Sequence, residues 1–74
     1  MTVKRAKIIW SRSWPGWHVR FRDGGDLVEY SSELGKLGFN AGREKLEKAA
    51  LKDIENAGYE AGPVVEFLVE VDCN

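Results

Sequence analysis

The chain has 74 residues, a net charge of −1 and a hydrophobic fraction of 43%. One domain of this size buries only about 60% of the surface that its unfolded chain exposes, so we expect its three Trp, three Phe and two Tyr residues to build the core. This composition excludes a disordered tail, and no apolar stretch approaches the roughly 20 residues of a membrane span.

Residues 4–14 and 17–22 predict two strands, which Pro15-Gly16 joins as a hairpin. We expect Trp14 opposite Trp17, although a Pro-Gly pair favours a type II turn, whose twist fits a two-residue hairpin poorly, so a wider tip is the alternative. Strand alternation then sorts the side chains into two faces. The expected inner face holds Ile8, Trp10, Trp14, Trp17, Val19 and Phe21, interrupted by Arg12. The outer face receives Lys7, Ile9, Ser11, Ser13, His18, Arg20 and Arg22.

A second tight turn is predicted at Gly24-Gly25, because glycine adopts the positive φ angles of a primed hairpin turn. Its register sets Phe21 against Val28 on the inner face and Arg20 against Glu29 on the outer face. Both hairpins therefore agree on which face is inside.

The glycine-rich residues 31–42 predict a loop, with one helical turn opened by Ser31 or Ser32. Asn40 is the expected N-cap of the following helix, and Gly58 its C-terminal stop. The helix has an apolar stripe typical of packing on a sheet. The stripe contains Leu46, Ala49, Ala50, Ile54 and Ala57, and Leu51 flanks it.

Residues 64–71 predict a last strand, with Val65, Phe67, Val69 and Val71 facing inward and Val64, Glu66, Leu68 and Glu70 facing outward. A right-handed crossover sets this strand parallel to the first, at the sheet edge. We therefore expect a single α+β domain over residues 1–74. It has two layers: an antiparallel three-stranded meander followed by one helix and a fourth strand, in sheet order 3-2-1-4, with the helix on one face.

The charges are unevenly distributed along the chain. The first 22 residues hold six cations and no acid, which leaves five cations and all twelve acids, a charge of −7, in residues 23–74. Either basic and acidic strands neutralise each other side by side, or one of them forms a charged binding patch. The single cysteine, Cys73, excludes an internal disulfide framework and favours a cytoplasmic location.

We expect no enzyme, because the groups that catalysis needs do not converge. His18 and Cys73 are the only residues of their types, and no nucleophile elbow accompanies the serines. The glycines at 35–42 fit neither the dinucleotide-binding fingerprint nor the P-loop, and the pair Glu66 and Glu70 is better explained as exposed strand polars. Accordingly we expect no catalytic, cofactor or metal site.

The favoured function is a small protein-interaction module, acting as an adaptor, inhibitor or regulator on a protein partner or its own copy. Apolar side chains among charges on an open sheet face are typical of contact sites, and tryptophans at a hairpin tip are typical of interface hot spots. If the loop around Leu37 and Phe39 covers the two tryptophans, they close the core instead. The expected partner-binding residues are Ile9, Trp14, Trp17, Leu27 and Leu68.

The alternative function is nucleic-acid binding by the basic outer face, since phosphate contacts from clustered cations drive such binding. Neutralisation by Glu29, Glu66 and Glu70 weakens this alternative. The covered position of the aromatic residues also argues against it, because single-stranded nucleic acid stacks on exposed rings. The residues expected to carry it are Lys4, Arg5, Lys7, His18, Arg20 and Arg22.

Overall fold

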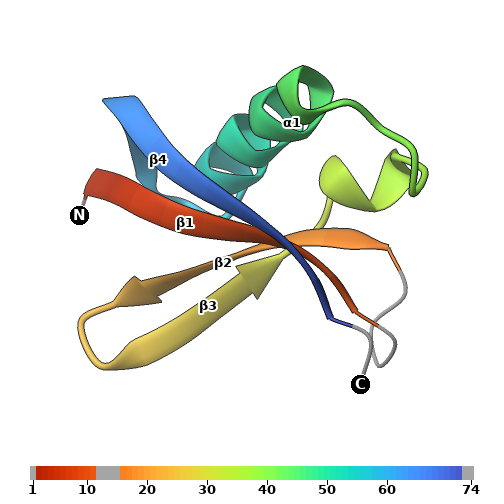
Figure 1. The fold of residues 1–74 in the computed structure, drawn as a ribbon. Helices are drawn as coiled ribbons and strands as arrows, with labels where there is room; N and C mark the ends of the chain where they lie inside the picture. Colours follow the sequence, from red (N-terminus) through yellow and green to blue (C-terminus); the bar gives the residue numbers. More distant parts are fainter. Residues whose placement is uncertain (1, 12–15, 73–74) are drawn as a thin grey trace.

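A computed structural model describes residues 2–11 and 16–72, in which a four-stranded mixed sheet carries one α-helix on one face (Figure 1). The sheet order is β3-β2-β1-β4, with β1 antiparallel to β2 and parallel to β4. The predicted α+β fold, strand order and crossover are therefore confirmed. The elements are β1 (Thr2–Ser11), β2 (Trp17–Asp23), β3 (Asp26–Tyr30), the 3₁₀ helix η1 (Leu34–Lys36), α1 (Arg43–Asn56) and β4 (Glu60–Asp72).

The register of the first hairpin differs from the prediction. Trp10, not Trp14, lies opposite Trp17, and Ile8 lies opposite Val19. The tip is thus wider than two residues, as the poor twist of a Pro-Gly turn favours. The partner of each β2 residue moves by four positions along β1, and because four is even the two faces keep their members. Trp14 lies outside the described residues.

The second hairpin confirms its predicted register, with Val19 opposite Tyr30 and Phe21 opposite Val28. Gly24 has a φ of 62°, the left-handed conformation that a tight hairpin turn requires and that glycine adopts without steric cost.

Helix α1 packs its predicted stripe on the sheet, and Leu46, Ala50 and Ile54 are buried. Its N-cap is Gly42 rather than the predicted Asn40, because the helix begins later than expected, at Arg43. Its end follows the prediction. Gly58 has a φ of 92° and donates its N–H to the Glu55 carbonyl, while the Tyr59 N–H reaches the Ile54 carbonyl, which together form a Schellman motif.

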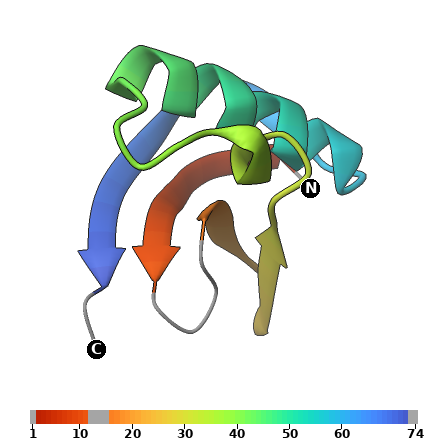
Figure 2. The same cartoon turned by 90° about the vertical axis from the view of Figure 1, so that its right-hand side faces the viewer.

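Buried Asp53 joins α1 to η1, which lies on the same side of the sheet (Figure 2). The carboxylate of Asp53 accepts the backbone N–H of Glu33 at 2.7 Å and that of Leu34 at 2.8 Å. These are the first donors of η1, which have no partner within the helix. Asp53 thereby fixes η1 so that Leu34, 0% exposed, enters the core.

Strand β4 is irregular at its start and regular afterwards. Its pairing with β1 shifts between Val3 and Arg5, opposite residues 62–65, and from Arg5 opposite Glu66 it continues unbroken. Phe67 is buried as predicted, whereas Val71, which strand alternation places on the same face, is 47% exposed. The helix begins beside Phe67, where Arg43 donates to the Phe67 carbonyl oxygen, so the end of β4 extends past the cover that α1 provides.

Candidate functional site

A broad open groove lies where the strands diverge. Strand β1 pairs with β2 only from Lys7 to Trp10, and towards the start of β1 the β1–β4 pair separates from the β2–β3 pair (Figure 1). The groove extends across β4 to the first turn of α1. Its lining includes six cations, Lys4, Arg5, Lys7, Arg20, Arg22 and Arg43, two acids, Glu47 and Glu66, and the apolar side chains of Leu27 and Leu68.

Acidic side chains of neighbouring elements neutralise most of these cations. The carboxylates come from β3, α1 and β4, so the predicted side-by-side arrangement of basic and acidic strands is what the structure contains. The ion pairs are Arg5–Glu66 at 3.2 Å, Lys7–Glu70 at 3.7 Å, Arg20–Glu29 at 3.4 Å and Arg43–Glu47 at 2.7 Å. Pairs as exposed as Arg5–Glu66 add little stability, so their main effect is to reduce the excess positive charge of the groove.

Two apolar side chains of the groove are about half exposed, Leu27 at 49% and Leu68 at 54%. Both were predicted on the outer face, and their exposure confirms that position. Val64 on the same strand as Leu68 is 78% exposed. Apolar side chains surrounded by charged groups are a feature of protein contact sites.

The prediction that Ile9 and His18 are open to solvent is wrong. Ile9 is 2% exposed and His18 is 0% exposed, although both lie on the face away from α1. Ile9 lies in a central strand, opposite His18 on one side and Glu70 on the other, and long neighbouring side chains can cover such a position with their apolar stems. Neither side chain is therefore available to a partner or to nucleic acid.

Burial sets the protonation of His18. Burial lowers the pKa of the imidazole below its ordinary 6.5. The Glu29 carboxylate, which lies 3.3 Å from Nε2, and a hydrogen bond to the Gly16 backbone raise the pKa, but by less than burial lowers it. The nearby charge of Arg20 lowers the pKa further. The histidine is consequently neutral in the folded protein at neutral pH.

We expect stability to fall as the pH falls below about 6.5. In that range His18 is protonated in the unfolded chain but stays neutral in the folded chain, so lowering the pH favours unfolding. The loss of stability ends once the pH is below the lower pKa that His18 has in the folded protein. Urea midpoints measured between pH 7.5 and pH 5 check this, with His18→Gln as the comparison that lacks the step. A wild type that gains stability over this range relative to His18→Gln would contradict the assignment.

The loop alternative for the tryptophans is confirmed at Trp17. Its side chain is buried at 3% exposure, donates Nε1–H to the Gly38 carbonyl at 2.9 Å and stacks on Phe39. Trp10 contacts the rings of both Trp17 and Phe39 edge to face. Trp17 thus closes the end of the core, which corrects its assignment as a partner-binding residue. The expectation for Trp14 lies outside the described residues.

Three side-chain contacts of the fold were not predicted from the sequence. Asp53 holds η1, Arg43 binds the Phe67 carbonyl, and Tyr59 donates its hydroxyl to Asp23 at 2.8 Å. The last bond is the main cause of a raised Tyr59 pKa. A weak signal existed for Asp53, an acid one residue before the buried Ile54 in the helical stripe, but its partners lie far away in the sequence.

Comparison with protein-family profiles, curated proteins and solved structures gave no match. Within residues 2–11 and 16–72, no three His, Cys, Asp or Glu side chains are grouped so that they could hold a metal ion. In the same part of the chain, no helix has the length and apolar character needed to cross a bilayer.

Proposed function

We propose that this protein is a small non-catalytic interaction module that binds another protein through its outer sheet face. The supporting observation is that Leu27 and Leu68, each about half exposed, share one groove with cations that neighbouring carboxylates neutralise. Burying an exposed apolar patch of this kind in an interface is favourable.

Replacing Leu27 with lysine is expected to weaken partner binding at least tenfold, because the variant removes buried apolar area and places a charge in the contact. The measurement is affinity capture from the native host, with quantitative comparison of each captured polypeptide. The matched control is Asn56→Lys, which adds the same side chain at an exposed position at the end of α1.

Both variants should keep the far-ultraviolet circular dichroism spectrum of the wild type. A polypeptide lost with Leu27→Lys and retained with Asn56→Lys supports the proposal. Equal capture by all three proteins would refute the assignment of Leu27 to the contact.

A second candidate, nucleic-acid binding, draws on the excess of six cations over two acids in the groove lining. Lys4 and Arg22 lie there without a salt bridge among the described residues. This function requires affinity for DNA or RNA that falls steeply with salt. Fluorescence titration at low and high salt measures it, and no response at low salt would eliminate it.

A further inference from the structure

The outer edge of β4 borders the groove and shares Glu66 and Leu68 with its lining. Strand β4 stands last in the sheet order and pairs on one side only, with β1, among the strands of the described residues. Edge strands present unpaired N–H and C=O groups that can pair with a further strand. Pro63 and the register shift protect the start of β4, whereas residues 66–72 are regularly paired with β1 and contain neither proline nor a cation. Within this segment the Phe67 carbonyl already accepts a hydrogen bond from Arg43 of α1, so backbone pairing with an added strand relies on the residues that follow Phe67.

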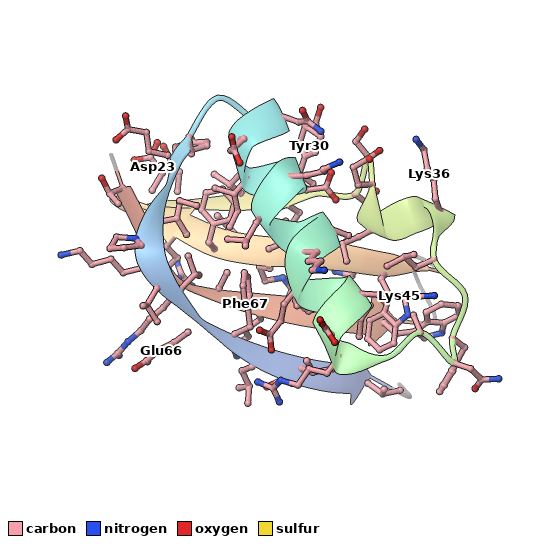
Figure 3. The ribbon with its side chains drawn as sticks, turned by 90° about the horizontal axis from the view of Figure 1, so that it is seen from above. Asp23, Tyr30, Lys36, Lys45, Glu66 and Phe67 are labelled. Carbon is pink, nitrogen blue, oxygen red and sulfur yellow. The ribbon has the colours of Figure 1, made fainter. Side chains whose placement is uncertain are left out.

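The outward side chains of this regular segment alternate between acid and apolar groups. Glu66, Leu68 and Glu70 follow each other on the outer face, and Figure 3 shows Glu66 pointing away from α1 at the sheet margin. Glu66 uses Oε2 to bind Arg5, and Glu70 uses Oε1 to bind Lys7. Since both oxygens of a carboxylate accept hydrogen bonds, each acid retains an oxygen for a cation on an added strand.

A second copy of this chain is a poor occupant of the edge. All the charged residues of β4 are acids: Glu60, Glu66, Glu70 and Asp72. Antiparallel pairing of two copies about Leu68 places Glu66 opposite Glu70 of the second copy, and like charges directly opposite destabilise a sheet. The edge therefore disfavours its own copy and favours a strand of opposite charge.

We infer that residues 66–72 bind an extended segment of another protein in which two Lys or Arg residues flank an apolar residue at alternate positions. The segment adds a strand to the sheet, its backbone pairs with β4, its cations meet Glu66 and Glu70, and its apolar side chain packs on Leu68. This inference rests on the proposed function in that the partner is a protein and Leu68 belongs to both contacts, but it concerns the sheet edge and does not involve Leu27.

The probe is a fluorescent synthetic peptide, threonine-arginine-valine-leucine-valine-arginine-threonine, compared with a peptide that has glutamate in place of both arginines. Fluorescence anisotropy at low salt should show saturable binding of the arginine peptide and at least tenfold weaker binding of the glutamate peptide. Amide chemical-shift changes should concentrate in residues 66–72.

Charge reversal provides the decisive comparison. The double variant Glu66→Lys, Glu70→Lys should prefer the glutamate peptide, whereas Glu44→Lys, Glu55→Lys, with the same change of charge on exposed positions of α1, should keep the wild-type preference. If the first variant fails to fold, Glu66→Gln, Glu70→Gln should lose the preference altogether.

Three results would overturn the inference: no binding of the arginine peptide, equal loss in both charge-reversal variants, or a wild-type dimer that Leu68→Lys dissociates. These outcomes are separable from the proposed function. A partner lost with Leu27→Lys while the arginine peptide fails to bind rejects the edge alone. A bound peptide with capture unaffected by Leu27→Lys rejects only the contact at Leu27.

Discussion

Replacing Ile9 with aspartate is expected to leave the protein largely unfolded. Ile9 is 2% exposed and lies opposite Glu70, so the variant loses a buried apolar side chain, encloses a short carboxylate that cannot reach water, and sets it beside a like charge. The combined cost is about 4 kcal/mol or more, against a total of roughly 3–5 kcal/mol for a domain of this size. Far-ultraviolet circular dichroism and a thermal melt measure the loss.

The control for this prediction is the same substitution at Leu27. Leu27 is 49% exposed and lies opposite Arg22, so Leu27→Asp should change the free energy of unfolding by less than about 1 kcal/mol. Ile9→Val, which removes one methylene, should cost about 0.5–1.5 kcal/mol. If Ile9→Asp is as stable as Leu27→Asp, the burial of Ile9 on the outer face is contradicted.

Asp53→Ala is expected to lower the free energy of unfolding by about 3 kcal/mol. The variant removes two hydrogen bonds to a charged acceptor, each worth about 1.5–3 kcal/mol, and leaves the N–H groups of Glu33 and Leu34 without their partner. Urea denaturation measures the change. Because the loss is local to η1, hydrogen exchange of those two amides should accelerate more than exchange within β2.

Asp53→Asn retains an acceptor oxygen but loses the charge, and we expect an intermediate loss. Glu55→Ala changes an exposed acid on the same helix and should have an effect within about 0.5 kcal/mol. A cost below about 1 kcal/mol for Asp53→Ala would show that η1 is held mainly by Leu34.

The fold was predictable because its faces follow from local alternation. Ile8, Val19 and Phe21 were placed inside, and all three are buried, even though the first hairpin register was wrong by four residues. An even slip preserves the face of every side chain, so the assignment of faces tolerated the error. Only an odd slip would have moved the core residues into solvent.

The site was less predictable because its features depend on neighbours that are distant in the sequence. The exposure of Leu27 and Leu68 followed from alternation, but alternation alone cannot show that Ile9 and His18 on the same face are buried. The ion pair of Arg5 with Glu66 depends on the parallel register of β1 and β4. The charge distribution along the sequence suggested that the two strands are neighbours, but it could not determine their register. Asp53 carried no signal for its two amide partners.

The pairing of β1 with β4 also bears on how the chain reaches its folded state. Strand β1 is synthesised before the other described elements but borders β4, which follows all of them, so one side of a central strand stays uncovered until residues up to Asp72 have left the ribosome. Parallel pairing between such distant segments forms slowly, because a long loop must close before its contacts can form. The β2–β3 hairpin needs only local contacts, and the nascent protein should therefore acquire it well before the sheet is complete.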